Sequence, residues 1–371
     1  MTHLANGHAH SRSWASAFGR ASRLTAIGLD TDDRGVFAVQ LARGRSGWAL
    51  RSVLSISTPS LDPDESSEPS LAELLERSGF SGKRAIAPAP ADKLIRSLLD
   101  LPARQAGLPL DQIAAQELAR VHRTDVDALQ TAWWELPHPT RGSDATPALA
   151  LGLAHADAEA YTDRLEAQGV EIERLETRGV ALARAASGVL RQCGGVSAIA
   201  YLGWNQASIL IYAKGTIVYE RAVDELRALP VHVALSERLE LDPELVMHAM
   251  EHIGLVGDGR RDSLPHEAVA ILREHVDAIA SELHASFSYV AHRYNDEDLG
   301  RVLLAGPHAS IPGLASTIAE RLGAECDLLT PAMLVEVPES LQSFAEASRL
   351  CTAIGLAMPA SQNQRLAEDS A

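Results

Sequence analysis

The chain has 371 residues, of which 46% are hydrophobic, enough apolar sequence to bury a large core in two or more lobes. Its 33 basic and 49 acidic side chains give a formal charge of −16, which argues against nucleic acid as a partner because binding to a phosphate backbone depends on lysine and arginine. The three cysteines form no C-x-x-C pair and no apolar run approaches the roughly 18 residues of a membrane span, so we expect a cytoplasmic protein without a thiolate metal site.

The N-terminal arm differs in charge from the rest of the chain. Residues 1–29 contain no aspartate or glutamate, and Trp14 and Phe18 are interleaved with arginines. This pattern fits a short helix lying on anionic lipid, but we favour a disordered basic arm over residues 1–24 because terminal segments of this length are usually unpinned. The polar tail over 359–371 is also expected to be disordered.

The first predicted elements form a three-stranded meander followed by a short helix and a further strand. Alternating apolar residues and turn residues indicate these elements. The strands are predicted over residues 25–29, 36–41, 48–56 and 85–89, the helix over 71–77, and a polar turn over 30–35.

Residues 92–170 interrupt this pattern and read as a separate insert. Strands over 94–99, 129–136 and 148–153 are mixed with helices over 110–121 and 158–168. This order is typical of a small α+β module. A helix over 178–193 then leads into the second half.

The second half opens with a copy of the first meander. Strands are predicted over 196–202, 207–213 and 216–223, with a turn over 203–206. The copies, which open at residues 25 and 196, are offset by 171 residues, a spacing that indicates two lobes rather than a solenoid.

A long amphipathic helix dominates the remainder. Apolar residues recur every three or four positions over 266–294 and predict one buried stripe, while His266, His275, His284 and His292 are expected on its polar side. The other elements are helices over 229–239, 243–254 and 314–322, a strand over 301–305 and a last helix ending at 353–357.

These elements, in this order, resemble the fold shared by actin, sugar kinases and heat-shock ATPases. More narrowly, the chain is similar to the type IV pilus assembly protein PilM family over about residues 25–358. The segments that carry the likeness are 38–41, 163–170, 178–184, 303–306, 311–314 and 353–357. The resemblance implies an α/β, actin-like (ribonuclease H-like) two-lobed fold with duplicated β-hairpin sheets and an inserted α+β subdomain.

The resemblance also implies domain boundaries. The first lobe takes residues 25–91 with 171–195 and 340–358, the inserted partner-binding subdomain takes 92–170, and the second lobe takes 196–339.

In this fold the two hairpin turns hold the phosphates of ATP, with Mg²⁺, through motifs resembling Asp-x-Gly, because glycine lets backbone N–H groups approach phosphate. The resemblance therefore makes a set of nucleotide-contacting candidates: Asp30, Thr31, Asp32, Gly203, Gly306, Ala309 and Gly313.

The chain departs from the motif in each loop. Asp32 stands where the family has glycine, Tyr201 stands where it has aspartate, and Pro307 and His308 interrupt the late glycine loop. One added carboxylate about 5 Å from a phosphate costs roughly 3 kcal/mol at an effective dielectric near 20. We therefore expect weak or absent binding of ATP with Mg²⁺ and no catalysis, although Asp30 alone could still contact a nucleotide or Mg²⁺.

The resemblance implies a partner as well. It is the cytosolic N-terminus of a single-span inner-membrane protein of PilN type, with other platform proteins and ring self-assembly as further contacts. Trp133 and Trp134 are the candidate partner-binding residues, and because neighbours on a strand point to opposite faces one of them is expected to face outward. The alternative is that both pack inside the module.

The sequence thus predicts a cytoplasmic scaffold of a type IV pilus or related secretion platform, held at the inner membrane through its partners. The alternatives are an active ATPase or small-molecule kinase of the same fold, and a filament-forming cell-division relative. His248 and His252, four apart on a helix, have metal-binding spacing but no third ligand nearby, so we expect a solvated helix face.

Overall fold

The computed structural model describes residues 24–359, except 45–46, 58–68, 104–107, 139–144, 194, 253, 256–265 and 295–298. The expected arm over 1–24 and tail over 359–371 therefore lie, apart from Leu24 and Pro359, outside the described residues. Among the described helices, none is long and apolar enough to cross a membrane.

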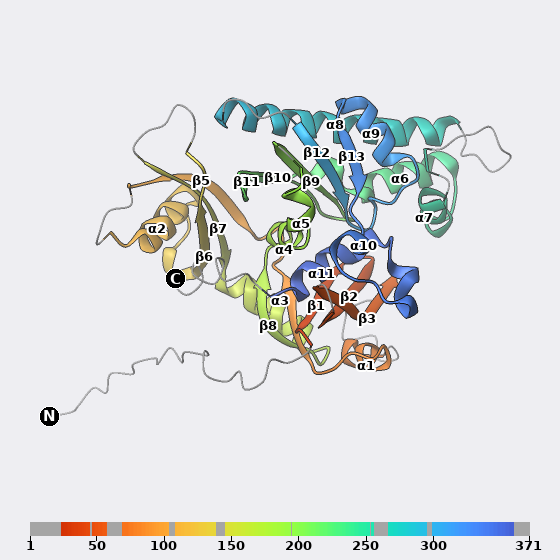
Figure 1. The fold of residues 1–371 in the computed structure, drawn as a ribbon, viewed down its shortest axis with the longest axis horizontal. Coiled ribbons are helices and arrows are strands. Elements are labelled where there is room, and N and C mark those ends of the chain that lie inside the picture. Colours follow the sequence, from red (N-terminus) through yellow and green to blue (C-terminus); the bar gives the residue numbers. More distant parts are fainter. Residues whose placement is uncertain are drawn as a thin grey trace.

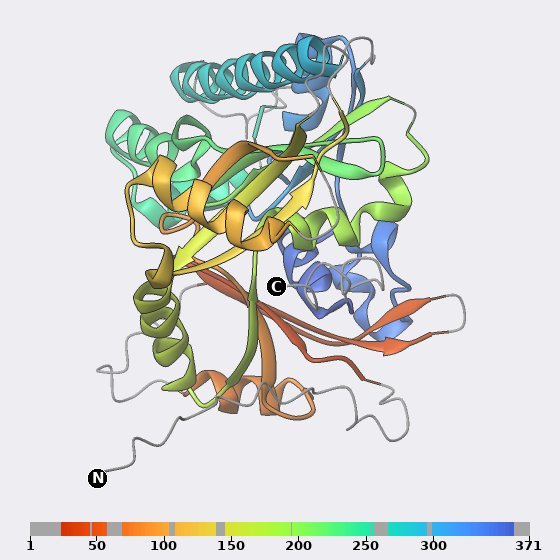
Figure 2. The same ribbon diagram turned by 90° about the vertical axis from the view of Figure 1, so that its left-hand side faces the viewer.

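Two five-stranded mixed sheets form the two lobes (Figures 1 and 2). The first has the order β3-β2-β1-β4-β8 and the second has the order β11-β10-β9-β12-β13. The strands of the first are β1 Ile27–Asp32, β2 Gly35–Arg43, β3 Trp48–Ser57, β4 Arg84–Pro88 and β8 Glu171–Glu176. Those of the second are β9 Val196–Leu202, β10 Ala207–Ala213, β11 Thr216–Ala222, β12 Leu299–Ala305 and β13 Glu325–Leu328. In each sheet an antiparallel meander is joined by parallel strands, so the duplication predicted from the sequence is present.

Helices cover both faces of both sheets. The outer face of the first sheet is covered by α1 Leu71–Arg77 and α3 His155–Glu166, and that of the second by α6 Ala228–Leu239, α8 His266–Tyr294 and α9 Leu314–Leu322. Between the sheets lie α4 Arg178–Ala185, which packs on the second sheet, and α11 Cys351–Ala357, which packs on the first. Other described helices of the lobes are α5 Ser187–Leu190, α7 Pro243–His252 and α10 Pro331–Leu334.

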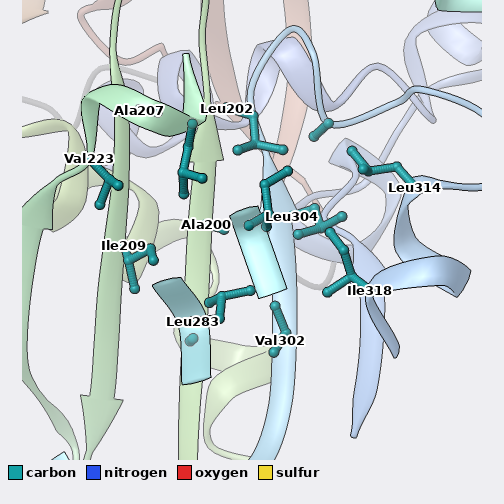
Figure 3. Close-up of a cluster of buried hydrophobic side chains, with 14 of the residues drawn as sticks. Ala200, Leu202, Ala207, Ile209, Val223, Leu283, Val302, Leu304, Leu314 and Ile318 are labelled. Atoms are coloured by element: carbon teal, nitrogen blue, oxygen red, sulfur yellow. The ribbon is translucent and has the colours of Figure 1, made fainter. Parts of the chain in front are cut away.

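The largest core cluster lies between the second sheet and α8 (Figure 3). The seven apolar residues predicted to form the stripe of α8 are Val269, Leu272, Val276, Ile279, Leu283, Phe287 and Val290. Six of them are buried there, and Val269 is half-buried. The prediction that all four histidines of this helix lie on its polar side was wrong for His275, which is 8% exposed. The helical spacing identified the stripe but not its width, which depends on how deeply the helix sits on the sheet.

A three-stranded sheet with the order β5-β7-β6 stands beside the lobes, with α2 Leu110–His122 on one face. Its strands are β5 Ile95–Leu101, β6 Leu129–Glu135 and β7 Thr146–Ala154. We call β5, α2, β6 and β7 the inserted module. Helix α3, which follows β7, packs instead in the core of the first lobe through Leu165 and Tyr161.

Three local expectations need correction. The first hairpin turn is only Asp33 and Arg34, because β1 extends through Asp32, which pairs with Gly35. The helix expected over 178–193 is interrupted at Ala186, where ψ is 0°, between α4 and α5. Strand β13 was not expected, since four residues alternate too briefly to register as a strand.

Candidate functional site

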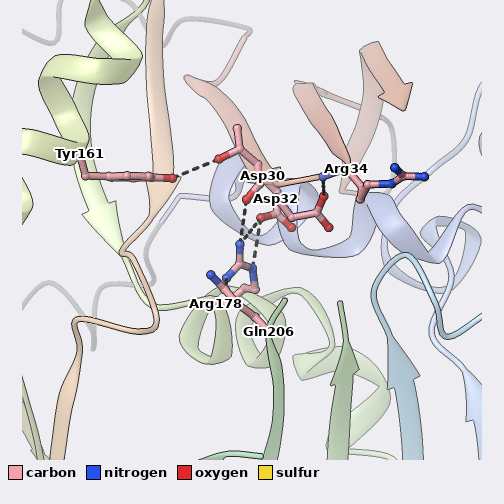
Figure 4. A network of polar contacts seen from close by, with 7 residues as sticks. Asp30, Asp32, Arg34, Tyr161, Arg178 and Gln206 are labelled. Carbon is pink, nitrogen blue, oxygen red and sulfur yellow. Dashed lines mark hydrogen bonds and ion pairs between the residues drawn. The ribbon is translucent and has the colours of Figure 1, made fainter. Parts of the chain in front are cut away.

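The ends of β1 and β9, which carry the predicted nucleotide-contacting turns, meet between the lobes (Figure 4). The residue that joins them is Arg178, the first residue of α4. Its Nη2 and Nε donate to Asp30 Oδ1 over 2.8 and 3.1 Å, and Nη2 also donates to the Thr31 carbonyl over 3.2 Å. Its Nη1 donates to Gln206 Oε1 on the opposite turn. Arg178 therefore bridges the two lobes, and we call its surroundings the interlobe site.

The ion pair at the interlobe site is buried. Asp30 is 1% exposed and Arg178 is 8% exposed. Burial alone lowers the pKa of Arg178, but the Asp30 carboxylate more than offsets this, so that the pKa is raised and the guanidinium stays charged. A buried charge needs such a partner, because removing one member of the pair leaves the other charge buried and unpaired.

The three acidic residues here have different surroundings. Asp32 Oδ1 accepts from the backbone N–H of Arg34 over 2.8 Å, while burial raises the pKa of the carboxyl to about 6 with Asp30 adding to the effect. Asp30 Oδ2 and Asp32 Oδ2 are buried without a hydrogen-bond partner among the described residues. Asp33 is exposed and accepts from the Asn205 amide across the lobes.

Tyr201 fills the centre of the interlobe site. Its ring lies 5.1 Å from the Arg178 guanidinium, and the residue is 3% exposed. A Cβ on Gly203 would come 2.8 Å from this ring, and one on Gly306 would come 3.0 Å from it. Both predicted glycines therefore do line the site, but an aromatic ring lies against them. Burial raises the pKa of Tyr201 well above its ordinary value, so the hydroxyl stays protonated.

A second interlobe contact involves Arg34 and a group of buried rings. The Arg34 guanidinium lies 4.8 Å from the Trp204 ring. On its other sides Trp204 contacts His232 at 4.9 Å and His308 at 5.5 Å between ring centroids. Burial lowers the pKa of His308 to about 4, so it is neutral near pH 7.

The other predicted nucleotide-contacting residues lie either at the interlobe site or at its edge. Thr31 Oγ1 shares a 3.2 Å hydrogen bond with the Tyr161 hydroxyl of α3. The His308 N–H donates to the Leu202 carbonyl over 3.1 Å, and the Ala309 N–H donates to the Gly306 carbonyl over 3.3 Å, which holds the late loop beside β9. Gly313 instead caps α9, with φ of 83°, and its carbonyl accepts from the Thr317 N–H of that helix over 3.0 Å.

Trp133 and Trp134 point to opposite faces of β6. The Trp133 indole N–H donates to Asp111 Oδ1 on α2 over 2.8 Å, and the Trp134 N–H donates to the Ile217 carbonyl of β11 over 2.9 Å. Both residues are half-buried. Trp134 therefore links the inserted module to the second lobe.

His248 and His252 stack with ring centroids 4.1 Å apart on α7. Within the described part of the chain, no group of three potential ligands surrounds a point where a metal ion could bind.

Sequence reasoning missed Arg178, Gln206 and Trp204. A signal for Arg178 exists, since a cation at the first position of a helix opposes the helix dipole and needs a local anion. The acidic Asp30-Asp32-Asp33 segment was the complementary signal. Nothing in the local pattern connects two residues 148 positions apart.

The comparisons with known proteins place the chain among actin-like folds. Residues 258–361 match the model of the family described as Type IV pilus assembly protein PilM. No curated protein sequence matches the chain.

Three solved structures illustrate the fold. A PilM-PilN type IV pilus biogenesis complex is similar with a TM-score of 0.72 and 17% identity, covering 91% of this chain and 98% of that one. The ethanolamine utilization protein EutJ from Carboxydothermus hydrogenoformans has a TM-score of 0.51, 15% identity and coverage of 91% and 90%. MreB 5 of Spiroplasma citri, bound to AMPPNP, has a TM-score of 0.50, 10% identity and coverage of 95% and 100%. The family match confirms the predicted resemblance to PilM, and the structural likenesses confirm the actin-like fold.

Proposed function

Taking the likeness to the type IV pilus assembly protein PilM family as the premise, we propose that this chain is a scaffold of a type IV pilus, or related secretion, assembly platform. Its proposed partner is the cytosolic N-terminal peptide of a single-span membrane protein of PilN type. Its proposed location is the cytoplasmic side of the inner membrane, where that partner holds it.

The observation that carries the proposal is the likeness to the PilM-PilN complex over nearly the full length of both chains. The fold itself does not settle a function, because actin-like folds serve many. Among these functions, the family match over residues 258–361 supports pilus assembly.

The arrangement of the interlobe site supports weak or absent nucleotide binding. MreB 5 shows that the fold accommodates AMPPNP in another protein. In this chain Asp30 is already paired with a guanidinium, and the Tyr201 ring lies against Gly203 and Gly306, where the resemblance implies nucleotide-contacting backbone. A magnesium nucleotide does not fit these residues as arranged, since it would have to separate Asp30 from Arg178 and approach the Asp32 carboxylate.

The inserted module supports the proposed peptide binding. Its sheet has an edge at β6, where Gln130, Ala132 and Glu135 are exposed. An extended peptide can add to such an edge, with main-chain hydrogen bonds giving affinity and pockets for alternate side chains giving selectivity. We propose that Trp133 and Trp134 contribute to this peptide binding. We also propose the boundaries of the lobes and of the insert that were predicted from the sequence.

The test is peptide binding to the full chain by isothermal calorimetry. The peptides are the cytosolic N-termini of single-span proteins encoded beside this chain. Ala132→Arg, at the exposed β6 edge, should weaken binding at least about tenfold because a long charged side chain obstructs strand addition. Ala270→Arg, on the exposed face of α8, is the matched control and should bind as the wild type does. Equal binding by both variants would place the peptide elsewhere, and no binding by the wild type would contradict the proposed partner.

A further inference from the structure

The first turn of α4 begins with Arg178 and Gly179. These two residues contact the first lobe, the opposite hairpin turn, and strands β10 and β11. Arg178 holds Asp30 of the first lobe and Gln206 of the second. Gly179, the next residue, packs against β10 and β11. A Cβ at Gly179 would come 2.7 Å from Leu210 Cδ1 and 2.8 Å from Glu220 Oε2, so an added methyl group would displace the ends of these two side chains.

Glu220 is the point at which α4 meets the inserted module. Its side chain is 3% exposed, and its Oε1 accepts from Nη2 of Arg96 on β5 over 3.4 Å. Burial raises the pKa of Glu220, while Arg96 opposes that effect. Together with the bond from Trp134 to the Ile217 carbonyl, this ion pair attaches the module to the edge of the second sheet.

The ion pair is incompletely satisfied. Glu220 Oε2 and Arg96 Nε are both buried, and neither has a hydrogen-bond partner within the described residues. A buried pair with one long contact gains little Coulomb energy against the cost of removing both charges from water. The strength of the Arg96–Glu220 ion pair therefore depends on the position in which neighbouring residues hold the Glu220 side chain. Gly179 is packed directly against that side chain.

Asp30, Arg178, Gly179, Glu220 and Arg96 thus form an unbroken series of contacts from the interlobe site to the inserted module. We propose that the first turn of α4 couples Asp30 to the Arg96–Glu220 contact. A change in the charge of Asp30, or in its contact with Arg178, then changes how firmly the module is held to the second lobe. The use of this coupling rests on the proposed function: it would let the interlobe site regulate peptide binding by the module. The coupling itself can be measured without any peptide.

Hydrogen exchange of the full chain, followed by mass spectrometry, tests the coupling. Asp30→Asn keeps the shape of the side chain but removes the charge that holds Arg178. We expect amides in β11 and β5 to exchange at least about tenfold faster in this variant, while amides in β12 keep their wild-type rate. Asp33→Asn is the matched control, because it alters the same hairpin at a residue that does not contact Arg178, and it should leave β11 and β5 unchanged. Faster exchange confined to the two hairpins of the interlobe site would overturn the proposal.

A double-mutant cycle covers the case in which Asp30→Asn loosens the whole fold. Unfolding equilibria in urea are compared for Asp30→Asn, Glu220→Gln and the double variant. If the sites are coupled, the effects on the equilibrium constant depart from additivity by at least about threefold. Asp30→Asn combined with Glu173→Gln, an exposed residue paired with Arg84, should be additive. Additivity of both pairs would contradict the coupling whatever the chain binds, and so separates this inference from the proposed function.

Discussion

At the scale of single residues, the interlobe site gathers buried charge that the fold must accommodate. Arg178 neutralises one carboxylate, Asp30, through two nitrogen contacts to the same oxygen. Asp32 receives only a backbone N–H at one oxygen. Buried carboxylates without a close cation shift toward the protonated form, so the charge of Asp32 destabilises the folded state.

Replacing Asp32 by asparagine is therefore expected to stabilise the protein near neutral pH. The folded-state pKa of about 6 lies above the unfolded value of 3.8, so ionisation penalises the folded state fully above pH 6, and the penalty disappears as the pH falls to about 4. The gain should be up to about 3 kcal/mol at pH 7 and close to zero at pH 4. Urea unfolding at both pH values measures it. Asp92→Asn, at an exposed carboxylate, should show no such gain.

The buried imidazoles of His275 and His308 act in the opposite direction. Burial lowers the pKa of each to about 4, below the unfolded value of 6.5, so the unfolded chain binds more protons between these pH values and stability is lost as the pH falls through that window. The effect of Asp32 on stability and the opposite effect of the two histidines overlap between pH 6 and 4.

His275→Leu should reduce the loss of stability between pH 7 and pH 5 by about 2 kcal/mol, since one titrating imidazole is removed. The quantity to compare is the difference between urea unfolding energies at the two pH values, because leucine can also change packing. His284→Leu, at an exposed position on the same helix, serves as the control. An unchanged difference for His275→Leu would show that His275 titrates normally in the folded state.

At the scale of elements, α11 is held between β1 and α4 by close backbone approach. A Cβ on Gly28 of β1 would lie 1.9 Å from the Ala353 carbonyl oxygen, and one on Gly355 of α11 would lie 2.1 Å from the Ala181 carbonyl oxygen. Arg184 also donates to the Gly355 carbonyl over 2.8 Å. The two helices between the sheets, α4 and α11, thus approach each other closely through glycine, and the Arg184 side chain adds a hydrogen bond between them.

Gly355→Ala should destabilise the fold by more than about 3 kcal/mol, because the added methyl group meets main-chain atoms that cannot rotate away. Gly188→Ala in α5 is the matched control, since no atom lies within 4 Å of its Cβ position, and it should be neutral or slightly stabilising. Thermal unfolding of the two variants compares them directly. A Gly355→Ala protein as stable as the wild type would mean that α11 can shift away from α4.

At the scale of the whole molecule, the two lobes are joined by contacts from both hairpins. Asp33 binds Asn205, Arg34 stacks on Trp204, and Arg178 spans the remaining distance to Gln206. An actin-like protein that closes on a nucleotide needs this region free to receive phosphate. Here side chains of the protein itself hold the lobes together.

Millimolar Mg·ATP should therefore raise the melting temperature by less than about 1 °C, since a ligand stabilises only in proportion to its binding. The variant carrying Asp32→Gly and Tyr201→Asp should show a larger shift, because it restores the glycine and the acid that the resemblance implies. Mg·ADP and Mg²⁺ alone are the reference additions. A large shift with the wild type would contradict weak binding, and no gain in the variant would assign the loss to Arg178 and its neighbours.

Local patterns in the sequence were enough to predict the elements that bury one regular face. Alternating apolar residues gave the meanders that open both lobes, and three-and-four spacing gave the stripe of α8. The offset between the meanders was enough to predict two lobes of one fold. Such patterns are readable because each element buries one face, and its period repeats within a few residues.

Which charges meet depends on contacts between segments that are far apart in the chain. Arg178 reaches Asp30, and α3 leaves the inserted module to pack Leu165 in the first lobe. His275 is buried although its helix position looked polar, and β13 forms on only four residues because β12 supplies its hydrogen bonds. These outcomes depend on which distant segments the topology brings together. A local period carries no information about that choice, because burial and ion pairing are properties of the space that several elements share.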